Sequence, residues 1–324
     1  MASAPAKVIL FGEHFVVYGK PAIALAINRR AQAVVKQRKD EQIYINSIDL
    51  GLSGSFYKGG FQAERGGEEA RVRLEPIRRA IENVLKRADV SGRVGVNVEI
   101  RSSIPVAAGL GSSAAVAAAT TMAVSHLLNI PLSKEDVFNI TYEAECLVHG
   151  TPSGIDPAIS THGGVIMFQR QRGFTWLDVE TEIPLVIGDT GIKRSTGELV
   201  GMVRTMRERY PSILEPVMEA GGKIVLQAVK ALKAGDLPAL GELMNMNHAL
   251  LYAIGVSNEP LERLVHAARK AGALGAKLTG AGGGGCMIAL PAPNRVEAVA
   301  NAIRQAGGTP FIAKKTEEGV KVEG

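Results

Sequence analysis

The sequence between residues 94 and 128 constrains the fold more than any other part of the chain. Residues 94–100 resemble a strand, residues 105–115 read Pro-Val-Ala-Ala-Gly-Leu-Gly-Ser-Ser-Ala-Ala, and an alanine-rich helix pattern follows. Glycines let backbone N–H groups approach an anion closely, and a helix start presents free N–H donors at the positive end of its dipole. Ser112 and Ser113 add hydroxyl groups there. The segment therefore predicts a phosphate site and indicates nucleotide chemistry.

The composition is typical of a globular protein with a sizeable core. The chain has 324 residues, of which 46% are hydrophobic and 21% are charged, enough for one large domain or two ordinary ones. The net charge is +5, and the tightest basic group is at residues 36–39, which a solvated strand edge or loop explains better than nucleic-acid binding. Cys146 and Cys286 have no CxxC spacing, so we expect neither disulfides nor a zinc site, and a reducing cytoplasm fits.

An uncharged stretch at residues 102–133 has the length of a membrane span. It contains Pro105, two glycines, paired threonines and His126, and alanine is its most frequent residue. A buried helix in a soluble core is therefore expected. Because the N-terminus also lacks the charged start and apolar core of a signal peptide, we expect a cytoplasmic protein without a membrane partner.

Hydrophobic periodicity predicts an α+β chain. Strands are expected at residues 8–11, 22–27, 31–36, 42–48, 94–100, 164–169, 174–179, 185–189, 286–290 and 310–314. Helices are expected at residues 72–88, 113–128, 133–148, 196–209, 212–234, 236–253, 258–271 and 294–305. Loops are expected at residues 12–19, 51–67, 149–157 and 280–285. The strand at 185–189 is expected to open a second domain, which divides the chain into domains 1–180 and 181–324.

Two common nucleotide-binding patterns can be compared with the glycine segment. The phosphate loop GxxxxGK[ST] does not occur in the sequence. Residues 109–114 match the dinucleotide pattern GxGxxA, but that pattern needs a strand directly before it and an acidic residue about twenty positions later, at the end of the next strand. Here Pro105 intervenes and residues 129–131 end a helix. An NAD-dependent oxidoreductase is the less favoured alternative.

Three further features favour phosphoryl transfer. Glu145 and Asp156 flank a loop rich in Gly, Pro and Ser, and a magnesium–phosphate centre needs one carboxylate for the metal and one near the acceptor hydroxyl. Lys7 precedes an apolar strand and could place its ammonium beside a carboxylate or phosphate. Residues 280–285 contain only Gly and Ala, so they can line a ligand closely. Each feature alone has an ordinary structural explanation, and together they favour a phosphoryl-transfer site.

These segments together resemble the GHMP kinase superfamily, whose three motifs are matched in order by residues 5–19, 105–119 and 277–286. Residues 12–19, Gly-Glu-His-Phe-Val-Val-Tyr-Gly, resemble the form found in the mevalonate kinase family, whereas galactokinases usually continue after Gly-Glu-His with Asp-Tyr-Asn. Residues 149–156 and 193–196 are also similar to that family. Phe15 departs from the alanine of many members, and the length is similar to that of compact prokaryotic forms.

The resemblance implies a fold and a reaction. The fold would have an N-terminal domain similar to ribosomal protein S5 with a left-handed βαβ unit, a ferredoxin-like C-terminal domain, and an active site between them. The reaction would be the ATP- and Mg²⁺-dependent phosphorylation of the C5 hydroxyl of mevalonate to 5-phosphomevalonate, in the route to isoprenoids. Dimers are common among relatives, so a homodimer is expected.

The resemblance also implies a role for individual residues. Asp156 would be the catalytic aspartate with Lys7 beside it, and Ser112 and Glu145 would hold Mg²⁺. ATP would be bound by Pro105, Val106, Ala107, Ala108, Gly109, Leu110, Gly111, Ser112, Ser113, Ala114, Ala115, Gly282 and Gly283. Mevalonate would be bound by Glu13, His14, Arg194 and Thr196, since a guanidinium suits a carboxylate substrate.

Several alternatives remain open from the sequence. Asp156 could accept the hydroxyl proton as a general base, or could only orient the hydroxyl while Lys7 and Mg²⁺ stabilise the transition state. The substrate could instead be a sugar or phosphomevalonate, as in related kinases. A sensor that binds ATP and a metabolite without turnover is a further possibility.

Overall fold

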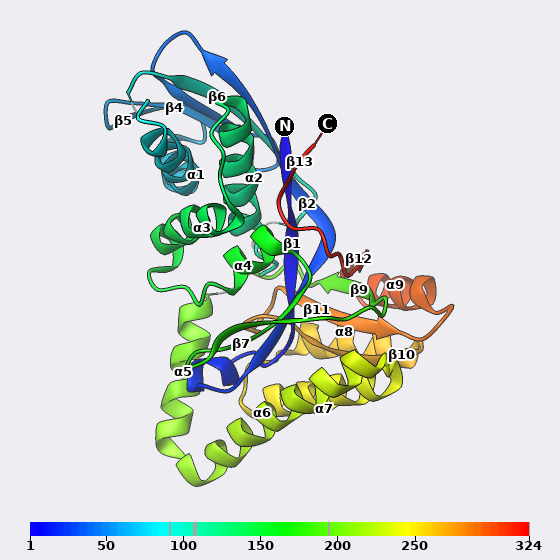
Figure 1. Ribbon diagram of the computed structural model, residues 1–324. Helices are drawn as coiled ribbons and strands as arrows, with labels where there is room; N and C mark the ends of the chain where they lie inside the picture. The colour runs from blue at the N-terminus through cyan, green and yellow to red at the C-terminus, as the bar shows by residue number, and fades with distance from the viewer. Residues whose placement is uncertain (91, 106–108, 194, 324) are drawn as a thin grey trace.

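Two β-sheets organise the chain, and helices pack against both of them (Figure 1). The structure is a computed structural model that describes residues 1–90, 92–105, 109–193 and 195–323, without the side chain of His149. The ribbon in Figure 1 shows the first sheet with helices α1–α4 in one half of the molecule and the second sheet with the remaining helices in the other half. The predicted α+β class is therefore confirmed.

The larger sheet has nine strands within the described residues, in the order β13-β1-β2-β6-β3-β4-β5, with β7 paired to β2 and β8 to β7. Its strands are β1 Ala2–Phe11, β2 Ala22–Arg38, β3 Ile43–Ser47, β4 Leu52–Tyr57, β5 Gly60–Arg65, β6 Gly95–Ser102, β7 Val165–Gln169, β8 Gly173–Leu177 and β13 Lys321–Val322. The pairing of β3 with β6 is parallel, and the other pairings in this sheet are antiparallel.

Strand β1 is longer than the predicted strand at residues 8–11. All ten of its residues are buried, because β1 lies between β2 and β13 and is covered by α2 Ser112–Leu127. Its first half consists of alanines, a serine and a proline, so hydrophobic periodicity gave no signal there. The register of β1 against β2 shifts between Pro5 and Ala6, where β2 carries two extra residues and bulges.

The region 51–67, predicted to be a loop, is mostly a β-hairpin formed by β4 and β5. The apolar side chains of Leu52 and Phe56 face the interior, and strand β3 supplies the backbone partners for β4. Gly54 is required because a Cβ there would lie 2.5 Å from the ring of Phe61. The prediction was wrong because the high glycine content was interpreted as irregular structure, whereas Gly54 allows close packing within a strand.

Four helices cover one side of the larger sheet: α1 Gly67–Arg87, α2, α3 Lys134–His149 and α4 Ile155–His162. Helix α2 is central, because it packs on β1 and β2 and also contacts the three other helices. Its buried residues are mainly alanines, whose small side chains let the helix and sheet backbones approach closely. Helix α3 begins at the predicted N-cap, where Ser133 and Asp136 form a capping box.

The second sheet is antiparallel, with the order β10-β11-β9-β12. Its elements are β9 Pro184–Asp189, α5 Thr196–Arg209, α6 Pro211–Ala234, α7 Leu237–Ala253, α8 Glu259–Lys270, β10 Ala273–Leu278, β11 Cys286–Pro291, α9 Val296–Gln305 and β12 Thr309–Lys314. Helices separate β9 from β10 and β11 from β12, so the chain follows the β-α-β-β-α-β succession of a ferredoxin-like unit. The predicted C-terminal arrangement therefore agrees with the structure.

The end of the chain returns to the larger sheet. After β12, strand β13 pairs with the first residues of β1, with Ala2 opposite Val322 and Ser3 opposite Lys321. The two chain ends consequently lie side by side (Figure 1). The second sheet opens with β9, close to the expected boundary, but the last residues complete the first sheet.

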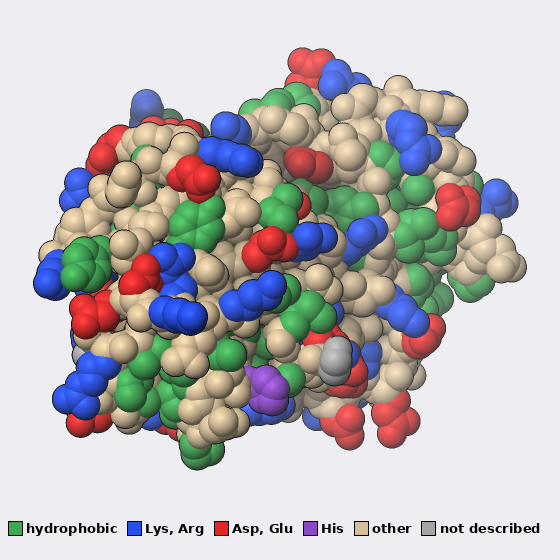
Figure 2. Space-filling view, turned by 90° about the horizontal axis from the view of Figure 1, so that it is seen from above, with side chains coloured by type: hydrophobic (Ala, Val, Ile, Leu, Met, Phe, Trp, Pro, Cys, Tyr) green, Lys and Arg blue, Asp and Glu red, His purple; other side chains and the backbone are tan. Residues whose placement is uncertain are grey.

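The surface carries charges of both signs. On the face seen in Figure 2, lysine and arginine side chains alternate with aspartate and glutamate side chains. On this face the charges of the two signs therefore lie close together. None of the helices in the described residues combines the length with the hydropathy that crossing a bilayer demands.

Candidate active site

Helix α4 positions Asp156. The helix begins inside the segment predicted as a loop at 149–157, so the end of that prediction was wrong. Pro157 is compatible with a helix here because it lies in the first turn, where backbone N–H groups have no partner within the helix. Asp156 lies in the same turn, so its carboxylate is near the positive end of the helix dipole.

Lys7 and Asp156 form an ion pair between two elements that are far apart in the sequence. Lys7 Nζ lies 3.1 Å from Asp156 Oδ1. The Lys7 side chain is 8% exposed, whereas that of Asp156 is 29% exposed. The Lys7 ammonium is therefore held inside the protein, whereas the Asp156 carboxylate remains partly accessible to solvent. This arrangement agrees with the sequence-based pairing of these two residues.

The first glycine loop lies against this ion pair. The Lys7 N–H donates to the Leu110 carbonyl over 2.9 Å, which ties β1 to the loop. Gly111 has a φ of 72°, and a Cβ there would lie 2.9 Å from Lys7 Cγ and 3.4 Å from Asp156 Oδ2. Only glycine combines that backbone conformation with this close approach. Helix α2 begins at the next residue, Ser112, so its free N–H groups face the same region.

Glu145 on α3 completes a group of three charged side chains. The residue is 2% exposed, and its carboxylate is hydrogen-bonded to Ser113. Burial, and then the negative charge of Asp156, raise the pKa of Glu145 from 4.5 to about 7, although Ser113 and Lys7 act in the opposite direction. The carboxylates of Asp156 and Glu145 therefore share the ammonium of Lys7, and an additional positive charge would be stabilised between them.

These residues line a large cleft with a cavity volume of about 2360 Å³. This exceeds the usual size of a small-molecule pocket, so two substrates could be held together. The predicted site residues found in its wall are Lys7, Pro105, Gly109, Leu110, Gly111, Ser112, Ser113, Glu145, Asp156 and Thr196. Val106, Ala107, Ala108 and Arg194 lie outside the described residues. Ala114 and Ala115 are fully buried in α2 and contribute to its packing.

The second glycine loop reaches the same cleft with a different pair of residues from those predicted. Gly280 and Ala281 line the cavity. Gly282 lies against Val256, whose carbonyl oxygen would be 2.0 Å from an added Cβ, and a Cβ on Gly283 would lie 2.9 Å from Cδ1 of Leu199. The glycines at 282 and 283 therefore allow the loop to pack, which brings its first residues to the cleft.

Glu13 and His14 are buried beside this loop, with 3% and 5% exposure. The Glu13 carboxylate forms an ion pair with Lys277 of β10, whose side chain is fully buried. His14 Nε2 lies 2.8 Å from the Ala281 carbonyl oxygen, and the Thr279 hydroxyl donates to the Ile9 carbonyl over 2.9 Å. These contacts fix the second glycine loop against the first sheet.

Lys277 has no assigned role in the sequence analysis, although a signal for it exists. It follows Gly275 and Ala276 and precedes Leu278 in a strand that is otherwise small or apolar. A lysine in such a strand requires a buried partner. Burial raises the pKa of Glu13 and lowers that of Lys277, while each partner opposes the effect on the other. The identity of the partner required the tertiary structure.

The buried Glu13–Lys277 pair gives a prediction for stability. Lys277→Met is expected to lower the free energy of unfolding by about 3–5 kcal/mol, because it leaves the Glu13 carboxylate buried without its cation. Urea denaturation measures the change. The double variant Glu13→Gln/Lys277→Met removes both charges and should recover most of the loss. A loss below about 1 kcal/mol in the single variant would contradict this account of the pair.

The pKa of Glu145 gives a prediction for pH dependence. Because the pKa is about 7 in the folded protein and 4.5 in its reference state, protonation of Glu145 favours folding. This stabilisation is complete below the lower value and is lost as the pH rises through the upper one. As the pH rises from 5 to 8, the unaltered chain should therefore lose about 2.5 kcal/mol of unfolding free energy that the Glu145→Gln variant does not lose.

Urea denaturation at the two pH values, with a chelator and without nucleotide, measures this difference. Glu143→Gln is a matched control because it changes an exposed carboxylate on the same helix. That variant should follow the unaltered chain. Identical pH profiles for Glu145→Gln and the unaltered chain would contradict the assigned effect of burial.

Comparison with known proteins identifies the family. Residues 75–164 match the GHMP kinases N terminal domain, and residues 228–309 match the GHMP kinases C terminal domain. A mevalonate kinase of Pyrococcus furiosus is 50% identical over 331 aligned residues, which cover 100% of this chain and 98% of that protein.

Solved structures agree with this result over nearly the whole chain. A mevalonate kinase of L. major in complex with R-mevalonate is 31% identical, with a TM-score of 0.84, and the match covers 98% of this chain and 96% of that one. The mevalonate kinase of Methanococcus jannaschii is 28% identical, with a TM-score of 0.85 and 98% coverage of both chains. The resemblance found in the sequence is therefore confirmed, and the chain belongs to the mevalonate kinase family within the GHMP kinases.

Proposed function

We propose that this protein transfers the γ-phosphoryl group of ATP to the C5 hydroxyl of mevalonate, yielding 5-phosphomevalonate and ADP in the route to isoprenoids. The observation that carries the proposal is the Lys7–Asp156 ion pair, at 3.1 Å, beneath a glycine loop and a helix N-terminus. A carboxylate next to a phosphate-binding loop is what a hydroxyl acceptor requires. Full-length similarity to mevalonate kinases supports the choice of acceptor.

The proposed ATP site is formed by residues 105–115 on one side and by the second glycine loop on the other. Backbone N–H groups at the start of α2 would bind phosphate oxygens, helped by the helix dipole. Gly280 and Ala281 supply the opposite wall, and Gly282 and Gly283 would assist by shaping the loop. Both loops face one cleft, which supports their joint action on one nucleotide.

The donors near Ser112 fit a magnesium ion. Glu145 is a buried carboxylate whose pKa is raised partly by the charge of Asp156, so an added cation would relieve the repulsion between them. We assign Ser112 and Glu145 as the residues that would hold Mg²⁺, since it prefers oxygen ligands and takes others from phosphates and water. When bound, the ion supplies charge neutralisation for the phosphate groups.

The proposed mevalonate site lies between the two glycine loops. Arg194 would bind the substrate carboxylate through its guanidinium, and Thr196 at the start of α5 lines the cleft nearby. Glu13 and His14 would form the buried floor of this site, held by Lys277 and by the second glycine loop. We infer that these residues place the C5 hydroxyl toward Asp156.

In the proposed reaction, the hydroxyl oxygen forms a bond to the γ-phosphorus while the bond from that phosphorus to the bridging oxygen of ADP breaks. The hydroxyl proton leaves either to Asp156 as a general base or to solvent, with Asp156 then acting by orientation. Lys7 lies beside the Asp156 carboxylate in both cases. Its positive charge would stabilise negative charge that develops around the transferred group.

We also propose a setting for this activity. The chain would act in the cytoplasm as a homodimer, without nucleic-acid or membrane partners. Its N-terminal domain would comprise residues 1–180 and its C-terminal domain residues 181–324. Support for the domain division comes from the second sheet, which opens with β9 at Pro184.

Release of ADP from Mg-ATP tests the proposed acceptor. The purified protein is assayed with mevalonate, galactose, homoserine and phosphomevalonate in parallel. Turnover with mevalonate alone is the expected result. Turnover with another acceptor would retain phosphoryl transfer but contradict the proposed pocket. ATP binding without turnover would favour the sensor alternative, and nicotinamide-dependent absorbance changes would favour an oxidoreductase.

Asp156→Asn tests the proposed catalytic carboxylate. This variant is expected to lose at least about a thousandfold in kcat, because it removes the charge next to the acceptor hydroxyl while keeping the shape of the side chain. ATP binding, measured by calorimetry, should change little because the phosphate-binding backbone is unaltered. Near-normal turnover in this variant would exclude Asp156 from the catalytic role.

A further inference from the structure

The last described residues of the chain lie against α4 and β1, the two elements that carry Asp156 and Lys7. We call residues 315–323 the C-terminal strap. The strap leaves β12, follows the end of α4 and ends as β13 beside β1. Thr316 N–H donates to the Ala26 carbonyl over 3.0 Å at the start of this path. The strap therefore contacts three separate elements of the larger sheet and its helical layer.

The strap is bonded closely to the C-terminal end of α4. Gly164 N–H donates to the Thr316 carbonyl over 3.0 Å, and Val320 N–H donates to the Thr161 carbonyl over 3.1 Å. A Cβ on Gly319 would lie 2.1 Å from the Thr161 carbonyl oxygen, and a Cβ on Gly163 would lie 2.3 Å from the Glu317 carbonyl oxygen. The backbones of the strap and of the end of α4 are therefore so close that a side chain at either glycine would push them apart.

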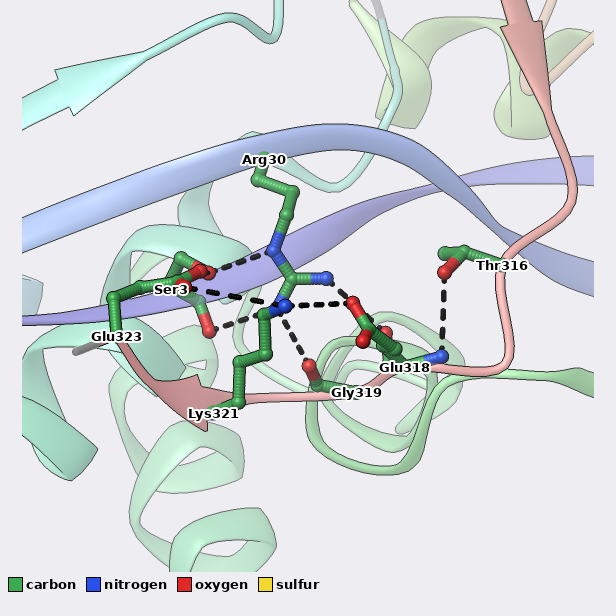
Figure 3. Close-up of polar contacts among 7 residues, drawn as sticks. All are labelled: Ser3, Arg30, Thr316, Glu318, Gly319, Lys321 and Glu323. Carbon is green, nitrogen blue, oxygen red and sulfur yellow. Dashed lines mark hydrogen bonds and ion pairs between the residues drawn. The ribbon is translucent and has the colours of Figure 1, made fainter.

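Arg30 connects the strap to β1 (Figure 3). Its guanidinium donates to the strap carbonyls of Glu318, over 3.2 Å, and Gly319, over 2.6 Å. It also donates to Ser3 of β1, to the hydroxyl over 2.7 Å and to the carbonyl over 3.1 Å. Figure 3 shows the guanidinium between Ser3 on one side and the strap on the other. One planar side chain therefore fixes the distance between β1 and the strap.

The residues held by the strap lie close to the catalytic pair along each element. Ser3 precedes Lys7 by four residues in β1, and Thr161 follows Asp156 by five residues in α4. The Ser160 hydroxyl also lies 3.3 Å from the Pro5 carbonyl oxygen, which joins the two elements directly. Arg30 is paired opposite Pro5, next to the two bulged residues Asn28 and Arg29 of β2, and Pro5 precedes Lys7 by two residues.

We propose that Arg30 is a positioning residue for phosphoryl transfer, because it joins the C-terminal strap to β1 and thereby sets α4 relative to β1. The strap holds the Lys7–Asp156 geometry from the side opposite to the substrate. A displacement of α4 would move the Asp156 carboxylate relative to the acceptor hydroxyl while leaving the phosphate-binding loop on α2 in place. A shift on the order of 1 Å in such a group is enough to lower turnover strongly. This inference rests on the proposed function.

Arg30→Met tests the inference, since it keeps an unbranched side chain like the aliphatic part of arginine and removes the guanidinium donors. We expect kcat to fall about tenfold while the KM for ATP stays within about twofold. The same substitution is then made in Asp156→Asn, where its effect on residual turnover should be below about twofold. A residue that only stabilises the fold would lower turnover equally in both backgrounds, and that result would overturn the proposal.

Gly319→Ala is a second, milder variant that pushes the strap away from Thr161 without changing any charge. It is expected to reproduce the loss in kcat. Gly201→Ala on α5, where nothing lies within 4 Å of an added Cβ, is the matched glycine control. This control should keep normal turnover.

Amide hydrogen exchange provides a readout that does not depend on turnover. Faster exchange is expected across α4 in Arg30→Met and Gly319→Ala, with exchange in α7 unchanged. Unchanged exchange in α4, or normal kcat in both variants, would overturn the positioning role. The exchange experiment needs no substrate, so it tests the positioning role of the strap separately from the proposed function. If the unaltered protein had no kinase activity, that result would contradict only the proposed function.

Discussion

The ion pair between Lys7 and Asp156 is the interaction on which the arrangement of this molecule depends. It joins the first strand to a short helix about 150 residues later, and the residues around it are shaped to permit it. A side chain at Gly111 would collide with Lys7, and the burial of Glu145 beside the pair raises the pKa of its carboxyl group. In the proposed reaction, the phosphate-binding backbone, the acceptor carboxylate and the metal-binding carboxylate would thus meet around one ammonium, which suits chemistry dominated by charge.

The sequence was informative where a residue acts through its immediate neighbours. Glycine, serine and a helix pattern together indicated the anion site at 105–115, because the free N–H groups of a helix start are a local property. The α+β class and most elements followed from periodicity for the same reason. Pairing Lys7 with Asp156 needed the family resemblance, since nothing local to either residue indicates the other.

The features that local patterns missed are those created by tertiary contacts. Hairpin β4–β5 was interpreted as a loop, although Gly54 within it makes room for the ring of Phe61. Helix α4 was hidden by Gly154 and Pro157, which usually mark a turn but here occupy a helix N-terminus. The partner of Glu13 lies 264 positions away in the chain, so only the folded structure could reveal Lys277.

The pairing of β1 with β13 also has a consequence for the order of events during synthesis. A chain emerging from the ribosome exposes β1 long before its outer partner β13, so that edge stays open while the residues between the two strands are synthesised. Contacts between residues so distant in sequence form slowly, because the closing of a long loop precedes any gain from them. The larger sheet therefore cannot be completed until the C-terminal strap has been made, and the strap decides when the first strand acquires its outer neighbour.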